Sequence, residues 1–139
     1  MSGTWEPRPV PELSEESAKF WQQAASGRLL LGKCTVCDNL FFYPRAACPY
    51  CLGTTTHEEA SGEGTVFTYS ISQQIDNWPE EDLPLIPAIV ELKEGVRIFT
   101  NIVDADPDEV SIGTAVEVTF IPTERDNIAI PVFTPRGDA

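Results

Sequence analysis

The chain has 139 residues and a formal net charge of −13, from 22 acidic and 9 basic side chains. This length predicts one domain, or a small module attached to one, with a core that forms without disulfides. The acidity argues against nucleic acid, because non-specific affinity comes largely from Lys and Arg that neutralise phosphates. No apolar run reaches the ~20 residues of a membrane span, and nothing resembles a signal peptide. We therefore expect a soluble cytoplasmic protein.

Residues 1–13 contain three prolines and no apolar period, which predicts a flexible arm. A helix is expected over residues 14–27. Ser14 is placed to cap it, and apolar residues recur at helical spacing after that position. Phe20 and Trp21 give this short helix a large apolar surface, which would either pack in the core or contact a ligand or partner.

All four cysteines fall into two C-x-x-C pairs, Cys34/Cys37 and Cys48/Cys51. Each such turn can aim two sulfurs at one ion, and two turns complete the tetrahedral thiolate shell that Zn²⁺ favours. Disulfides need an oxidising compartment, and a redox pair needs one C-x-x-C beside a strand–helix–strand unit. Four protein ligands leave no open position, so the zinc is expected to be structural. Iron stays open as the bound metal, because the second turn is similar to that of rubredoxin.

Residues 28–60 are expected to form a ribbon around this metal, with a short strand leading into each cysteine pair and a third strand after the second pair. Arg28, Lys33 and Arg45 make the ribbon the one region where positive charge gathers. Their simplest role is to offset the thiolates. His57 is redundant as a ligand beside four sulfurs, and we expect it to face solvent on the third strand.

Residues 61–139 change to a period of two, which predicts strands at spacings that suit a small barrel or sandwich. Five are expected, near Thr65–Ser72, Pro87–Leu92, Val96–Val103, Val116–Phe120 and Ile128–Val132. In the first strand Phe67, Tyr69 and Ile71 alternate with polar residues, a pattern that places these three on the buried face.

Two connections in this region are long and acidic. The first carries Trp78 beside a proline, and this ring would either contact a partner or fold back over a barrel end. The second, over residues 104–109, lacks the frame of a calcium-binding loop and is expected to be a solvated turn.

Catalytic constellations are missing from the sequence. His57 is the sole histidine and the cysteines are assigned to metal, so no Ser-His-Asp or Cys-His set can be assembled. There is no P-loop and no dinucleotide-binding fingerprint. The residues thus favour a binding or scaffolding protein over an enzyme, and we do not expect this chain to be catalytic alone.

Taken together, these features resemble the family that joins a rubredoxin-like zinc ribbon to an OB-fold, known as domain of unknown function 35. The motifs that carry the resemblance are Phe20-Trp21, Gly27-Arg28-Leu29, Cys34-x-x-Cys37, Tyr43-Pro44-Arg45, Cys48-Pro49-x-Cys51, Gly62-x-Gly64-x-Val66-x-Thr68-Tyr69, Pro87-x-x-Val90-x-Leu92 and Gly113-x-x-Val116-x-Val118-x-Phe120. They cover residues ~18–135. The implied fold is mainly β: an N-terminal helix, the four-cysteine ribbon and a five-stranded OB-fold barrel.

The resemblance also implies a function. Members of this family are non-catalytic accessory subunits of thiolase-like aldolases or thiolases, or of enoyl-CoA hydratases, including ones that degrade steroid or aromatic side chains. It places CoA phosphates near Arg28, Lys33 and Arg45, and the acyl group or the partner near Phe20, Trp21 and the barrel loops, with Trp78 among them. The expected assembly is a hetero-oligomer. The alternatives are a nucleic-acid-binding or regulatory zinc-ribbon module and an independent acyl-CoA enzyme.

Overall fold

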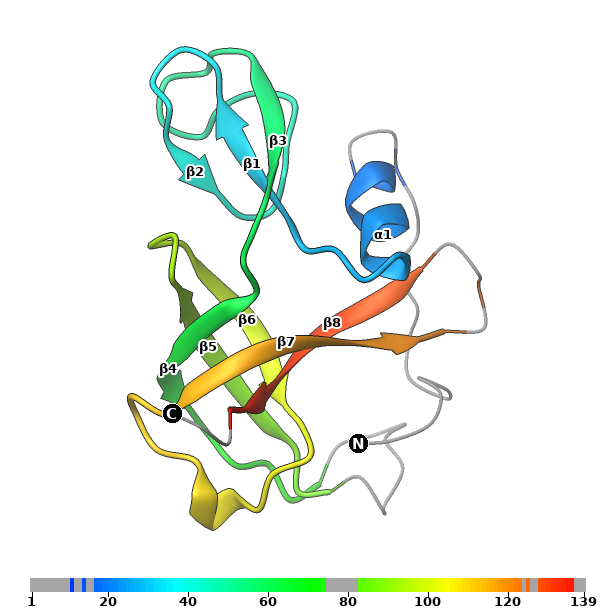
Figure 1. Ribbon diagram of the computed structural model, residues 1–139, viewed down its shortest axis with the longest axis vertical. Helices are drawn as coiled ribbons and strands as arrows, with labels where there is room; N and C mark the ends of the chain where they lie inside the picture. Colours follow the sequence, from blue (N-terminus) through cyan, green and yellow to red (C-terminus); the bar gives the residue numbers. More distant parts are fainter. Residues whose placement is uncertain are drawn as a thin grey trace.

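The computed structural model describes residues 11, 14, 17–74, 83–123, 125 and 128–136. A helix, a three-stranded sheet and a closed barrel follow one another along the chain, with the sheet above the barrel and the helix beside both (Figure 1). The elements are α1 (Ala18–Ala25), β1 (Leu30–Cys34), β2 (Leu40–Phe41), β3 (Thr55–Glu59), β4 (Glu63–Tyr69), β5 (Ile86–Leu92), β6 (Arg97–Ile102), the 3₁₀-helix η2 (Pro107–Glu109), β7 (Ala115–Pro122) and β8 (Ala129–Pro135). The predicted mainly β fold is confirmed.

Helix α1 begins later than its predicted cap. Its N-cap is Ser17, and Ser14 instead closes the turn in front, where its Oγ accepts the Ser17 N–H at 3.1 Å. The helix ends as expected, because Gly27 adopts a φ of +82° and its N–H reaches the carbonyl of Ala24 at 3.0 Å. The buried Phe20 and Ala24 share one side of the helix.

The ribbon sheet has the order β2-β1-β3, with both pairs antiparallel. Gly32 of β1 lies opposite Phe41 of β2. A Cβ at position 32 would come within 2.2 Å of the Phe41 ring, so glycine is what lets this ring lie flat on the strand. The buried Phe41 ring therefore packs directly against the β1 backbone at Gly32.

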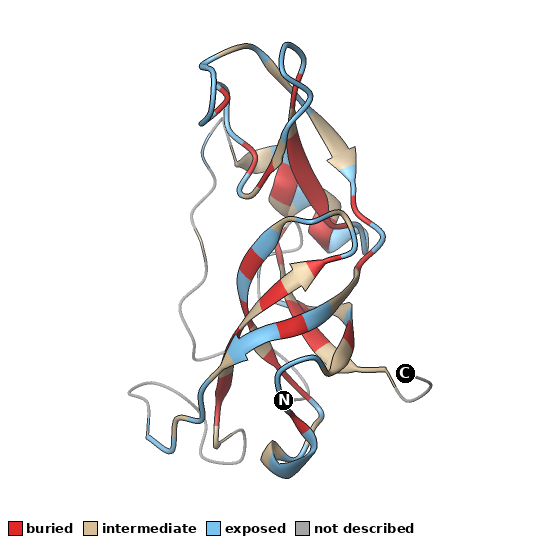
Figure 2. Cartoon of the chain, turned by 90° about the vertical axis from the view of Figure 1, so that its left-hand side faces the viewer, coloured by how far each residue is buried: buried red, intermediate tan, exposed pale blue. Residues whose placement is uncertain are grey.

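The barrel has the strand order β4-β5-β6-β8-β7 and closes on itself. Its strands alternate between buried and more exposed residues, as Figure 2 shows along their length. Ala88, Val90 and Leu92 of β5 point inward as predicted, and Phe133 of β8 is fully buried. This alternation places one apolar core inside the barrel.

The predicted buried face of the first barrel strand is right for Tyr69, which packs against the core, and wrong for Phe67 and Ile71, which are exposed. Val66 of β4 is buried instead. The cause is a β-bulge: the pairing with β5 passes from Val66 opposite Val90 directly to Thr68 opposite Ile89, so Phe67 is left between them. A strict period of two cannot anticipate such an inserted residue.

The ribbon and the barrel share one apolar core. Phe20, Leu29 and Leu31 belong to the same buried cluster as the inward residues of β5 and β6. The segment between α1 and β1 and the segment between β3 and β4 are hydrogen-bonded to each other, from the Ala60 N–H to the Leu29 carbonyl at 2.8 Å. Helix α1 packs against β8, β1 and β7, which ties the three parts together.

The acidic loop around η2 uses its carboxylates locally. Asp106 accepts the Asp108 N–H at 3.0 Å, and Glu109 accepts the Asp106 N–H at 2.9 Å, which forms a capping box. In the part of the chain that the structure describes, no helix has the length and apolar character to cross a membrane.

Candidate metal centre and adjoining hollows

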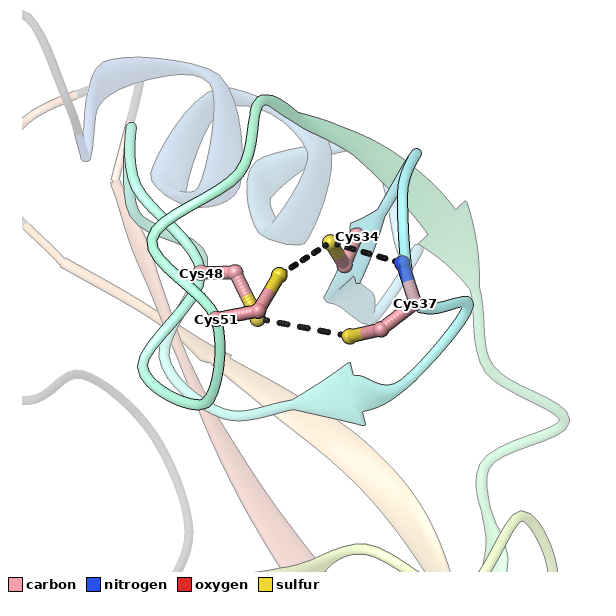
Figure 3. A group of neighbouring side chains, drawn as sticks. All are labelled: Cys34, Cys37, Cys48 and Cys51. Atoms are coloured by element: carbon pink, nitrogen blue, oxygen red, sulfur yellow. Dashed lines mark hydrogen bonds between the residues drawn. The ribbon is translucent and has the colours of Figure 1, made fainter.

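Four cysteine sulfurs converge at one end of the ribbon (Figure 3). Cys34 is the last residue of β1, Cys37 follows in the next turn, and Cys48 and Cys51 lie in the second turn. All four sulfurs lie within 4.8 Å of one another. Cys34 and Cys48 are buried, while Cys37 and Cys51 are exposed.

Sulfur spacing distinguishes a metal site from a disulfide. The Cys34 and Cys51 sulfurs are 3.4 Å apart, and those of Cys37 and Cys48 are 3.7 Å apart. A disulfide requires about 2.05 Å. A tetrahedron with Zn–S bonds of about 2.3 Å has edges of about 3.8 Å. The cluster therefore fits one Zn²⁺.

Backbone N–H groups are aimed at these sulfurs. The Sγ of Cys34 accepts from the N–H groups of Val36 and Cys37, both at 3.3 Å, and the Sγ of Cys48 accepts from the Tyr50 N–H at 3.3 Å. The side-chain amide of Asn39 donates to the Cys37 sulfur, also at 3.3 Å. Such donors favour thiolates and orient metal ligands.

The pKa values of two of these thiols are shifted in opposite directions. The Cys37 N–H lowers the pKa of Cys34 to about 6 against the opposing effect of burial. At Cys51 the Gly53 N–H favours the thiolate, but the neighbouring thiols and burial outweigh it and raise the pKa to about 12. A shared cation removes this competition for protons, because a coordinating thiol is deprotonated outright.

His57 lies on β3 opposite Gly32 and is half-buried, which corrects the expectation that it faces solvent. Burial, together with the positive charge of Lys19, lowers the pKa of its imidazole. It stands outside the sulfur group, in agreement with its predicted redundancy as a ligand.

Two hollows flank the aromatic residues that follow β2. The helix-side hollow, of about 520 Å³, lies between α1 and the second cysteine turn and is lined by Ser17, Phe20, Trp21, Tyr43, Pro44, Arg45, Ala47, Cys48, Pro49 and Leu52. The barrel-side hollow, of about 380 Å³, is lined by Pro11, Trp21, Phe42, Tyr43, Ile98, Phe99, Thr100, Asn101, Ile130 and Pro131. Trp21 and Tyr43 form the wall between them.

Phe20 and Trp21 have separate environments. Phe20 is 1% exposed and makes edge contacts with the rings of Trp21, Phe42 and Tyr43 at centroid distances of 4.8, 5.5 and 5.7 Å. It is a core residue that holds the helix against the ribbon. Trp21 is half-buried and borders both hollows, so it is the one of the two that a ligand or partner can reach.

The three ribbon cations do not share a hollow. Arg45 borders the helix-side hollow, while Lys33 forms an ion pair with Glu58 at 3.3 Å. Arg28 is exposed after α1 and lines none of the hollows found among the described residues. Trp78 lies outside the described residues, so its role stays a prediction.

Three residues were missed from the sequence: Tyr43 and Phe99, which border these hollows, and Arg97, which lines neither of them. Tyr43 and Phe99 are 50% and 70% exposed, and Arg97 stacks on Phe67. Tyr43 lies in a quoted motif and could have been found there. Phe99 and Arg97 alternate with the buried Ile98 on β6, so their outward direction follows from the strand period once the strand is placed.

Two family models match consecutive parts of the chain. The rubredoxin-like zinc ribbon domain of ChsH2 matches residues 21–58, and the C-terminal OB-fold domain of ChsH2 matches residues 57–120. The zinc ribbon match and the convergent sulfurs are consistent with a structural Zn²⁺.

Individual relatives agree with these matches. A DUF35 domain-containing scaffold protein of Methanothermobacter thermautotrophicus is 38% identical over 76% of this chain and 81% of its own length. A probable enoyl-CoA hydratase alpha subunit of Thermomonospora curvata is 32% identical over 92% of this chain, which spans 40% of that relative. A solved structure described as an Ltp2-ChsH2(DUF35) aldolase matches with 31% identity and a TM-score of 0.79, over 90% of this chain and 98% of the matched one. The chain therefore belongs to the DUF35 family, with a rubredoxin-like zinc ribbon followed by an OB-fold.

Proposed function

We propose that this chain is a non-catalytic accessory subunit that helps a thiolase-like or enoyl-CoA hydratase-like enzyme to hold acyl-CoA. The observation that carries the proposal is the match to the aldolase structure, because it extends over 98% of the matched chain with a TM-score of 0.79. What the two proteins share is thus a complete fold and not an isolated zinc site. The hydratase subunit among the relatives supports the same class of substrate.

The described side chains supply surfaces for binding. The four thiols converge on one point, where a metal would occupy them all, and His57 lies on β3 opposite Gly32, outside the sulfur group. Trp21, Tyr43 and Phe99 border the barrel-side hollow, and aromatic residues of this kind dominate the energetics of protein interfaces. We assign the partner surface to this aromatic region.

Nucleic-acid binding is less well supported. The outer face of the barrel carries Phe67 and Phe99, which could stack on bases. The chain as a whole, however, has a charge of −13. It therefore lacks the excess of cations that attracts a long phosphate backbone.

The test is co-expression with the candidate enzyme subunits, followed by sizing chromatography and turnover assays with and without this chain. We expect a stable complex and a higher turnover in its presence. Phe99→Ala should weaken assembly by about 2 kcal/mol or more if the ring is a hot spot, and Trp21→Ala should act in the same direction. Zinc content should stay unchanged in both variants.

Ile112→Ala is the matched control, because Ile112 is 71% exposed and lines none of the described hollows. It should assemble like the unmodified chain. Equal turnover with and without this chain, together with separate elution, would rule out the accessory role.

A further inference from the structure

A third hollow lies between the ribbon and the turn that joins β5 to β6. It measures about 470 Å³, and we call it the arginine hollow because Arg45 and Arg97 border it. The aromatic rings of Phe42 and Tyr50 also line it, and no carboxylate is found among its described lining residues. In a chain of charge −13, a hollow lined by two arginines and by no described carboxylate is a local exception, although Glu91, outside its lining, pairs with Arg97.

Arg97 is held in a fixed orientation at one side of this hollow. Its Nε donates to the Glu91 carboxylate at 3.0 Å, and its guanidinium carbon lies 3.8 Å from the centre of the Phe67 ring. These contacts fix the plane of the guanidinium, while the terminal nitrogens have no further partner among the described residues. A guanidinium with free terminal N–H groups is suited to bidentate binding of a phosphate.

Arg45 supplies the second cation from the ribbon. Its backbone is anchored because its carbonyl accepts a hydrogen bond from the Thr55 hydroxyl at 2.6 Å. Within the described residues no carboxylate forms an ion pair with its side chain, which is exposed. Arg45 and Pro49 also border the helix-side hollow, so the two hollows adjoin.

We propose that the arginine hollow binds the phosphate-bearing end of a nucleotide thioester. The diphosphate would lie against Arg45 and Arg97, and the rings of Tyr50 and Phe42 would flank the base. The volume is within the usual range of small-molecule sites, about 300–1,000 Å³. The identity of the ligand rests on the proposed function, whereas the preference for a phosphate rests on the two arginines. Arg97 is thereby added to Arg28, Lys33 and Arg45, the residues near which the family resemblance places the CoA phosphates.

The adjoining helix-side hollow indicates where the other end of the bound ligand would lie. Its lining includes Phe20, Trp21 and Leu52, so it suits the uncharged arm of the thioester better than its phosphates. A ligand that starts at the arginine hollow and passes Arg45 would carry its thioester toward Trp21. This direction leads to the aromatic region that we assign to the enzyme partner.

The experiment is calorimetric titration of the zinc-loaded full chain with CoA and with pantetheine, which has the same arm without phosphates. Arg45→Gln and Arg97→Gln should each raise the dissociation constant for CoA about tenfold, the effect of losing one charge-assisted hydrogen bond. Arg97→Lys keeps the charge but loses the planar fork, and should also weaken binding. Pantetheine binding should not respond to any of these changes.

Arg125→Gln is the control, because it removes the same charge from an exposed position that lines none of the described hollows. Zinc content and the thermal midpoint verify that each variant is folded. The inference is overturned if CoA binding is undetectable at millimolar concentration, or if both arginine variants bind CoA like the unmodified chain. If the chain still co-elutes with the enzyme partner, the accessory role stands without the CoA site. If it shows neither CoA binding nor co-elution, both proposals are wrong.

Discussion

The zinc ribbon and the barrel differ in what holds their strands together. In the ribbon, β2 has two residues, and the turns that follow β1 and β2 expose most of their side chains. Cys34 and Cys48 are the fully buried groups at that end. The barrel instead buries aliphatic and aromatic side chains from all of its strands, among them Val66, Val90 and Phe133.

This contrast separates two kinds of stabilisation. Apolar burial is non-directional and spreads over many contacts, so a barrel tolerates small losses at any one of them. In a metal site the stabilisation comes from four coordination bonds. The free energy of binding the ion is then part of the free energy of folding. Loss of one metal ligand is therefore expected to unfold the cysteine end of the ribbon completely, whereas loss of one core contact should lower the stability of the barrel only in part.

The largest effect is expected from Cys48→Ser. Structural zinc binding is worth about 10–16 kcal/mol in small zinc domains at neutral pH, and a serine leaves the shell with three thiolates. We expect zinc to be lost and amide exchange to rise sharply in the turns around Cys37 and Cys51. Metal analysis and hydrogen exchange measure both changes.

The barrel amides of β5 and β6 are the internal control for that variant, since their core does not touch the sulfur group. They should stay protected from exchange in Cys48→Ser. Retention of one zinc per chain with unchanged protection of the turns would contradict the assignment of Cys48 as a ligand.

A second prediction concerns the barrel core. Phe133→Ala removes a fully buried ring and should lower the free energy of unfolding by about 3–5 kcal/mol. The metal site lies apart from this ring, so the folded variant should still bind one zinc. Denaturant unfolding and metal analysis on the same sample test this pair of results, and zinc loss from the folded variant would show that the contrast between the two units is too simple.

The smallest effect is expected from Gly32→Ala. The added methyl group would press on the Phe41 ring, and overpacking of this kind costs about 1–3 kcal/mol. Phe41→Leu should recover part of that loss when both changes are combined, because the smaller side chain gives way. A double-mutant cycle of unfolding free energies measures the coupling. Additive effects would mean that the ring and the strand do not press on each other.

Much of this architecture follows from local sequence signals. Cysteine spacing predicts the metal cluster directly, since both C-x-x-C turns impose their own geometry. Periods of two locate the barrel strands, and glycine after α1 ends the helix where Gly27 stands. These signals succeed because each depends on a few neighbouring residues.

The remaining features depend on contacts between distant residues. The outward position of Phe67 results from the bulge opposite Val90, and nothing near Phe67 in the sequence marks it. Arg97 gains its orientation from Phe67 and Glu91, which belong to two other strands. The arginine hollow joins Arg45 to Arg97 across 52 positions of sequence, so only the three-dimensional arrangement reveals it.

The hydrogen bond from Ala60 to Leu29 has a mechanical consequence. It joins the segment that enters the ribbon from α1 to the segment that leaves the ribbon for β4, at the level where Leu29 and Leu31 belong to the shared core. A hinge would require these two segments to bend independently, and the hydrogen bond couples their movements. The ribbon is thus held at a fixed angle to the barrel. An enzyme partner that contacts both units must fit that angle.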